Sequence, residues 1–241
     1  MPMAAAMTDA VKRQTLVPAI AAIMPAAGIG SRMQASLPKQ YLQLHGKTIL
    51  EHSVAKLKSV PAIGPLWLAL ASDDPYYDTT PLAHSDITRV KGGAERMHSV
   101  LNALHFIDEH HFPWVLVHDA ARPLVRKSDI EHLITRCITE GEGGILACRV
   151  RDTMKRGESF VAETVSREHL WHALTPQLFP TALLKAALRD AVQAEVHVTD
   201  EASAMEWAGH KVLLVEGHSD NIKITQPADL ALAAFYLEQL T

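Results

Sequence analysis

The stretch Ala21-Ala22-Ile23-Met24-Pro25-Ala26-Ala27-Gly28-Ile29-Gly30-Ser31-Arg32, residues 21–32, sets the fold class of this 241-residue chain. Four apolar residues are ended by Pro25, and a loop with two glycines follows at once. This order predicts a buried strand whose carboxyl end opens into a loop. Backbone N–H groups of such a loop can approach phosphates closely, because glycine has no Cβ in the way. We therefore expect a phosphate-binding loop directly after the first strand.

Short β-rich runs alternate with longer helical periods along the rest of the chain. The alternation predicts an α/β fold with a Rossmann-like, mostly parallel twisted sheet flanked by helices, forming one domain over residues 19–241. Further strands are expected at 66–71, 87–90, 114–117, 144–150, 211–215 and 221–225. Helices are expected at 49–59, 94–106, 128–139, 180–193, 201–208 and 227–239. Ser128, with Glu131 three positions on, predicts a capping box at the start of its helix.

Two segments depart from this alternation. Residues 151–168 are polar and rich in charge, which predicts an insertion that protrudes from the domain as an arm. Residues 1–18 mix small residues with scattered charges, and their apolar stretches are too short for the core of a signal peptide. We expect a disordered or variable extension there.

Composition excludes several classes of partner. The net charge of −4 leaves no broad basic field, so we expect no nucleic acid. No apolar run reaches the roughly 18 residues that span a bilayer, so we expect no membrane. The two cysteines, Cys137 and Cys148, lack the spacing of a zinc site and indicate reduced thiols in the cytoplasm.

Two familiar glycine-loop motifs fit this chain poorly. The dinucleotide fingerprint of dehydrogenases needs Gly or Ala at the position of Met33 and an acidic residue at the end of a second strand. The P-loop signature is matched at its end by Gly46-Lys47-Thr48, but Tyr41 occupies the position of its first glycine. Gly46-Lys47 is therefore interpreted as a turn.

An acidic residue marks a second strand end, in His118-Asp119-Ala120-Ala121-Arg122-Pro123. Ligands of open α/β sheets bind beyond the carboxyl ends of strands, so Asp119 is placed to hold Mg²⁺, which prefers oxygen ligands. His118 is expected to be a packed neighbour rather than a metal ligand. Arg122 can present its planar guanidinium to a phosphate.

The chain resembles the 2-C-methyl-D-erythritol 4-phosphate cytidylyltransferases of the non-mevalonate isoprenoid pathway. The resemblance rests on blocks that run in order from residue 21 to the C-terminus: Pro25-Ala-Ala-Gly-Ile-Gly-Ser-Arg, Pro38-Lys-Gln-Tyr, Ile49-Leu-Glu-His-Ser-Val, His118-Asp-Ala-Ala-Arg-Pro, Arg151-Asp-Thr-Met-Lys-Arg, Leu170-Trp-His-Ala-Leu-Thr-Pro-Gln, Thr199-Asp-Glu-Ala-Ser and Asp220-Asn-Ile-Lys-Ile-Thr. It implies transfer of CMP from CTP to a sugar-alcohol phosphate, with release of pyrophosphate and with Mg²⁺ as cofactor.

The resemblance also implies a role for each matching residue. Cytosine and ribose would lie against Ala26, Ala27, Gly93, Ala94 and Ser99. The triphosphate would be held by the loop glycines Gly28 and Gly30 and by the catalytic cations Arg32, Lys39 and Lys223. Asp119 and Asp220 would organise the magnesium ion. The acceptor would be bound by Ala120, Arg122, Thr175 and Thr199, and by Thr153 and Arg167 reaching across a homodimer on the 151–168 arm.

One departure from the family concerns the base. An acidic residue often stands where this chain has Ala94 after Gly92-Gly93. If a side chain there helps to bind cytosine, selection of CTP over UTP is weaker in this chain. Two alternatives stay open: a cytidylyltransferase for another polyol phosphate, such as ribitol 5-phosphate, and a non-enzymatic nucleotide-binding regulator, which would have little need for Asp119, Lys39 and Lys223 together.

Overall fold

The structure is a computed structural model that describes residues 18–28, 33 and 37–239. Only the last position of the expected extension at 1–18 therefore lies within the described residues. Gly30 and Arg32 of the glycine loop also lie outside them. No helix in the described part is long and apolar enough to cross a membrane.

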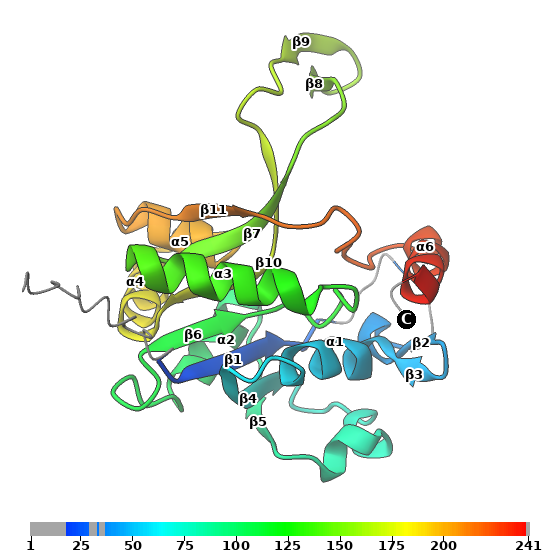
Figure 1. Cartoon of the computed structure of the whole chain (residues 1–241), viewed down its shortest axis with the longest axis vertical. Coiled ribbons are helices and arrows are strands. Elements are labelled where there is room, and N and C mark those ends of the chain that lie inside the picture. The colour runs from blue at the N-terminus through cyan, green and yellow to red at the C-terminus, as the bar shows by residue number, and fades with distance from the viewer. Residues whose placement is uncertain (1–17, 29–32, 34–36, 240–241) are drawn as a thin grey trace, which may run out of the picture.

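A seven-stranded sheet in the order β11-β7-β10-β6-β1-β4-β5 forms the centre of the molecule (Figure 1). Its strands are β1 (Ile20–Pro25), β4 (Ile63–Leu70), β5 (Ile87–Lys91), β6 (Trp114–Val117), β7 (Gly144–Arg149), β10 (Trp171–Pro180) and β11 (Leu213–Glu216). β1 pairs in parallel with both β4 and β6, β4 with β5, and β7 with β11. Only β10 runs antiparallel to its two neighbours, so the prediction of a mostly parallel sheet is confirmed.

Helices cover both faces of this sheet. Apolar side chains of α1 (Ile49–Lys58) and α3 (Lys127–Glu140) pack on one face, where Ile20, Ala22 and Met24 of β1 point. On the other face, α2 (Arg96–Leu104), α4 (Thr181–Gln193) and α5 (Glu201–Trp207) pack against Ala21 and Ile23. Successive residues of a strand point to opposite faces, so a strand buried on both sides must be apolar throughout. This explains the continuous apolar run of β1.

A smaller apolar cluster lies apart from the two faces of the sheet and includes Met33, which follows the glycine loop. It joins α6 (Pro227–Gln239) to the hairpin of β2 (Gln43–Leu44) and β3 (Lys47–Thr48). Gly46 has φ +76° in the turn of this hairpin, and Lys47 begins β3. The turn is therefore at His45-Gly46, one residue before the expected Gly46-Lys47. Three short 3₁₀ helices complete the described elements: η2 (Lys39–Tyr41), η3 (Tyr77–Thr79) and η4 (Pro81–His84).

The polar segment at 151–168 contains a two-stranded hairpin. Strands β8 (Met154–Gly157) and β9 (Val161–Val165) pair as an antiparallel hairpin. The hairpin projects well beyond the body of the molecule in Figure 1. Phe160 is 89% exposed and Val161 is 64% exposed at its tip.

Two local predictions were wrong, and one strand was not predicted. Helix α3 begins at Lys127, its N-cap is Arg126, and no side chain caps it, so Ser128 and Glu131 form no capping box. Residues 221–225 form no strand, because they cross the ends of the sheet instead of pairing with it. Strand β10 was not expected, since Pro176 and Pro180 interrupt its sequence, and its pairing with β7 shifts register between Ala173 and Gln177.

Candidate active site

A cavity of about 190 Å³ opens beyond the carboxyl ends of β1 and β6. Its lining combines the glycine loop, η2, the segment before α2, the end of β6 and Lys223. The lining residues are Pro25, Ala26, Ala27, Gly28, Lys39, Gln40, Gly93, Ala94, Glu95, Arg96, Ser99, Asp119, Ala120, Ala121 and Lys223. The structure therefore brings together the described residues that were predicted to bind the nucleotide, with Asp119, Ala120 and two of the predicted catalytic cations.

Backbone contacts shape the nucleotide side of the cavity. Ala26 donates its N–H to the Ala69 carbonyl at 2.8 Å, and the Gln40 side chain donates to the Ala26 carbonyl at 2.8 Å. The Ser99 hydroxyl accepts the Gly93 N–H at 3.0 Å. A Cβ on Gly92 would lie 2.4 Å from the Ala27 Cβ. The loop after β1 and the segment before α2 can approach this closely only because residue 92 has no side chain.

Gly92→Ala is therefore expected to force these two segments apart. Overpacking of a tight contact costs about 1–3 kcal/mol, so we expect a loss of that order in the free energy of unfolding. CTP affinity should fall as well, because Ala27 lines the cavity. Urea denaturation and calorimetric titration with CTP measure the two effects. Gly217→Ala is the matched control, since its Cβ would meet its neighbours at 3.4 Å or more. Equal stability of the two variants would contradict the packing argument.

Asp119 is the electrostatic centre of the site. Its side chain is 8% exposed, and Arg96 Nε lies 2.9 Å from Oδ1. Lys223 Nζ lies 2.9 Å from Oδ2, and Arg122 Nε lies 3.6 Å from the same oxygen. Burial alone would raise the pKa of this carboxyl, but Arg96, Lys223 and Arg122 together hold it well below the ordinary value. Asp119 is therefore an ionised carboxylate at neutral pH.

His118 and Thr175 hold the backbone of Asp119 in place. The Thr175 hydroxyl accepts the Asp119 N–H at 3.0 Å and lies 3.1 Å from His118 Nδ1. His118 Nε2 lies 3.0 Å from the Arg122 carbonyl, which can only accept, so the proton belongs on Nε2 and Nδ1 accepts from Thr175. Burial lowers the pKa of His118 to about 4 and keeps it neutral. This confirms that His118 is a packed neighbour.

The segment that carries Lys223 is tied to the end of β6. Arg122 Nη1 donates to the Asn221 carbonyl at 2.7 Å, and the Asn221 side chain donates to the Thr175 carbonyl at 2.8 Å. The Ile224 N–H donates to the Ala121 carbonyl at 2.9 Å. These bonds replace the sheet pairing that was expected for residues 221–225. They place the Lys223 side chain next to that of Asp119.

The donor set around Asp119 suits a magnesium ion. Mg²⁺ is usually held by one or two carboxylates together with phosphate oxygens and water. No group of three or more acidic, histidine or cysteine ligands occurs in the described part of the chain. Asp119 lines the cavity and Asp220 does not, so a metal ion in the cavity would take Asp119 as its first carboxylate. Asp220 pairs through Oδ2 with Arg126, while its buried Oδ1 has no hydrogen-bond partner among the described residues. The lone pairs of that oxygen are therefore not used by a hydrogen-bond donor, and a metal ligand needs such lone pairs.

The residues predicted for the acceptor are dispersed in the single chain. Thr175 is 4% exposed and its hydroxyl is used by Asp119 and His118, so its contacts are those of a positioning residue. Thr199 is exposed just before α5, and Thr153 is exposed on the arm. Arg167 donates to the Arg151 carbonyl and lines a second cavity of about 700 Å³ at the base of the arm. Their assignment to the acceptor stays a prediction.

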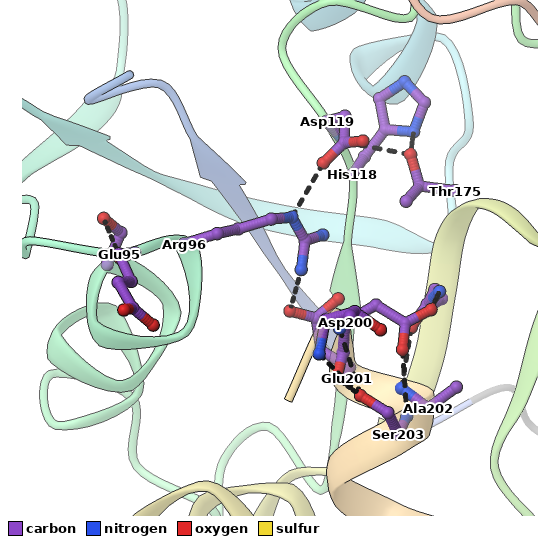
Figure 2. A network of polar contacts seen from close by, with 12 residues as sticks. Glu95, Arg96, His118, Asp119, Thr175, Asp200, Glu201, Ala202 and Ser203 are labelled. Carbon is purple, nitrogen blue, oxygen red and sulfur yellow. Dashed lines mark hydrogen bonds and ion pairs between the residues drawn. The ribbon is translucent and has the colours of Figure 1, made fainter. Parts of the chain in front are cut away.

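Two charged residues of the site were missed. Arg96 joins Asp119 to Glu201, whose Oε1 lies 2.5 Å from Arg96 Nη1, and Figure 2 shows this chain of contacts. Arg96 follows Gly92-Gly93 closely in the sequence, but its local pattern indicates only a helix. Glu201 lies in the Thr199-Asp-Glu-Ala-Ser block, where only Thr199 received a role.

Comparison with known proteins places this geometry in a family. The model of the IspD family, 2-C-methyl-D-erythritol 4-phosphate cytidylyltransferase, matches residues 20–239. The chain belongs to the IspD family. A protein of that name from Vibrio vulnificus (strain CMCP6) is 56% identical over 225 residues, covering 91% of this chain and 95% of the relative. One from Pseudoalteromonas translucida (strain TAC 125) is 53% identical over 222 residues, covering 92% of each chain.

The likeness extends to three-dimensional structure. The crystal structure of the IspD enzyme from Francisella tularensis matches with a TM-score of 0.78 and 37% identity, covering 90% of this chain and 99% of that one. Family and structure agree with the cavity, because an IspD enzyme is a cytidylyltransferase and must bind a nucleotide triphosphate beside a second phosphate.

Proposed function

We propose that this chain transfers CMP from CTP to 2-C-methyl-D-erythritol 4-phosphate, giving 4-diphosphocytidyl-2-C-methyl-D-erythritol and pyrophosphate. One observation carries the proposal: the loop after β1, Lys39, Asp119 and Lys223 line a single cavity in a member of the IspD family. Residues 19–241 would act as one nucleotidyltransferase domain. A cytoplasmic location is proposed with it, because Cys137 and Cys148 are free thiols.

The nucleotide occupies the cavity in this proposal. Cytosine and ribose lie against Ala26, Ala27, Gly93, Ala94 and Ser99, and the triphosphate lies along Gly28 and Gly30. Lys39, Lys223 and Arg32 supply the positive charge that the triphosphate needs. Gly30 and Arg32 keep these roles from the family pattern alone, since both lie outside the described residues.

The reaction needs charge neutralisation more than proton transfer. An oxygen of the acceptor phosphate attacks the α-phosphorus of CTP in line, the bond from that phosphorus to the β-phosphate bridge breaks, and pyrophosphate leaves. The nucleophile is already anionic, so no general base is required. Lys39 and Lys223 reduce the repulsion between the two anions and hold them in line. A magnesium ion held by Asp119 and Asp220 would neutralise further negative charge on the phosphates.

The acceptor site is completed by a second copy of the chain in this proposal. Ala120 and Arg122 are already beside Asp119, with Thr175 supporting them and Thr199 at the start of α5. Thr153 and Arg167 would be delivered across a homodimer by the 151–168 arm. Phe160 and Val161, which are exposed at the tip of the arm, would be covered in this assembly.

A pyrophosphate-release assay tests the proposed reaction. It crosses CTP, UTP and ATP with 2-C-methyl-D-erythritol 4-phosphate and ribitol 5-phosphate, in Mg²⁺ and in EDTA. We expect rapid release only with CTP, the methylerythritol acceptor and Mg²⁺. Preference for ribitol phosphate would overturn the acceptor assignment, and no release with any pair would overturn the enzymatic assignment. A substantial rate with UTP would indicate that an acidic side chain at position 94 normally helps to select the base.

Arg167→Ala is expected to raise the KM for the acceptor about tenfold or more while changing the KM for CTP little. The reason is that a lost charge-assisted contact to one phosphate weakens binding of that substrate alone. Steady-state kinetics with each substrate varied in turn measures the difference. Arg156→Ala is the control, since Arg156 pairs with Glu163 on the same hairpin. Equal changes in both KM values for Arg167→Ala would contradict a clamp on the acceptor.

A further inference from the structure

Glu201 is a buried carboxylate that the proposed reaction does not yet use. Glu201 is 0% exposed at the start of α5, and its Oε1 lies 2.5 Å from Arg96 Nη1. Burial raises the pKa of Glu201, while the Arg96 guanidinium opposes this shift by stabilising the ionised form. Its other oxygen, Oε2, has no hydrogen-bond partner among the described residues. An incompletely satisfied buried carboxylate is costly, so a structural role alone explains it poorly.

The surrounding hydrogen bonds fix Glu201 rigidly. Asp200 is the N-cap of α5, and its carboxylate accepts the Ser203 N–H at 2.9 Å. The Gln177 side chain of β10 donates to Asp200 Oδ2 at 2.9 Å and accepts the Ala202 N–H at 2.9 Å. Figure 2 shows Glu201 held in this turn with Arg96 between it and Asp119. Glu201 is therefore a fixed anchor for Arg96.

Arg96 contacts two carboxylates with different nitrogens. Its Nε lies 2.9 Å from Asp119 Oδ1, while its Nη1 faces Glu201. A guanidinium is not deprotonated in proteins, so Arg96 carries a permanent charge between these two carboxylates. A buried guanidinium without a counter-charge would be strongly destabilising. In this structure both oxygens of Asp119 face cations, Arg96 on one side and Lys223 on the other.

We propose that Glu201 is a positioning residue that keeps Arg96 neutralised, and thereby leaves Asp119 available to a divalent cation. The inference rests on the proposed function and deepens it. With a divalent cation on Asp119, Arg96 would keep Glu201 as its partner, and Lys223 would be able to contact the phosphates. Without the charge of Glu201, Arg96 has Asp119 as its only described carboxylate partner, and three cations surround a single carboxylate. Both changes weaken the binding of a divalent ion to Asp119.

Glu201→Gln tests the inference through metal binding without turnover. Binding of Mn²⁺ to the complex of the protein with CTP, in the absence of acceptor, is followed by electron paramagnetic resonance of the free ion. We expect the Kd for Mn²⁺ to rise on the order of tenfold, from the loss of one nearby charge at an effective dielectric of about 20. CTP affinity measured by calorimetry in EDTA should be unchanged or higher, because the site has become more positive.

The controls separate this effect from damage to the fold. Glu206→Gln changes an exposed carboxylate on the same helix and should leave the Kd for Mn²⁺ unchanged. Glu201→Asp keeps the charge one methylene further from Arg96 and should give a Kd between those of the wild type and Glu201→Gln. An unchanged Kd for Mn²⁺ in Glu201→Gln, or an equal loss of CTP affinity in EDTA, would overturn the inference. Wild-type protein that binds no CTP would instead overturn the proposed function.

Discussion

Lys223→Ala is expected to lower kcat/KM for CMP transfer by about 10²–10³, with the fold retained. Removal of one preorganised donor from a charge-stabilised transition state typically costs that factor. Lys223 is 36% exposed and Asp119 keeps Arg96 and Arg122 as partners, so stability should change little. Steady-state pyrophosphate release and thermal unfolding followed by circular dichroism measure the two quantities. Lys39→Ala should lose a similar factor, because Lys39 lines the same cavity.

Lys47→Ala is the matched control for both lysine variants, since Lys47 is exposed at the start of β3, outside the cavity. Its rate should equal that of the wild type. A near-normal rate in Lys223→Ala would remove this lysine from the mechanism. A large drop in the melting temperature would instead assign it to the stability of the site.

Asp119→Asn is expected to abolish activation by Mg²⁺ and to destabilise the fold together. Arg122 is buried and loses its carboxylate partner, whereas Arg96 keeps Glu201 and Lys223 is partly exposed. An uncompensated buried charge costs about 3–5 kcal/mol. Loss of the carboxylate also removes the principal candidate ligand of the metal, so kcat/KM should fall by at least the 10²–10³ expected for Lys223→Ala. Urea denaturation without metal and kinetics with varied Mg²⁺ measure the two effects.

The stability effect of Asp119→Asn has a definite dependence on pH. Asp119 has a folded pKa well below the ordinary value of about 3.9, so its contribution is fully present above that value. The contribution is lost as the pH falls from there through the folded pKa. The difference in unfolding free energy between wild type and variant should therefore be constant above about pH 5 and shrink only in stronger acid. A difference that vanished between pH 7 and 5 would contradict the ion-pair account.

The sheet was largely predictable because its strands are buried on both faces. Continuous apolar runs such as 114–117 are typical of strands that are covered on both faces. The helix at 49–58 was equally clear, since Leu50, Val54 and Leu57 form one apolar stripe, and all three are buried. The nucleotide side of the site follows from this sheet, because the loops after β1 and β6 must open at the same edge.

The errors lie where side-chain contacts override local pattern. Strand β10 carries prolines that disfavour an interior strand, yet it pairs with β6 and β7. Residues 221–225 have the composition of a strand, but Arg122 and the carbonyls of Ala121 and Thr175 hold them instead. The N-terminus of α3 uses Arg126, which pairs with Asp220, where a capping serine was expected.

The polar contacts that organise Asp119 were the least predictable part of the site. Arg96 and Glu201 are 105 positions apart, and no local spacing indicates that they meet. Their contact depends on α2 and α5 packing on the same face of the sheet. Motif matching found Asp119 and Lys223 individually, but their 2.9 Å contact required the fold.

A crystal structure with CTP and Mg²⁺ bound tests the central claim most directly. The account predicts the base against Ala27 and Gly93, the triphosphate along Gly28 with Lys39 and Lys223 on its oxygens, and the metal bound to Asp119. A nucleotide bound elsewhere, with Lys223 still on Asp119 and the cavity filled by water, would contradict it.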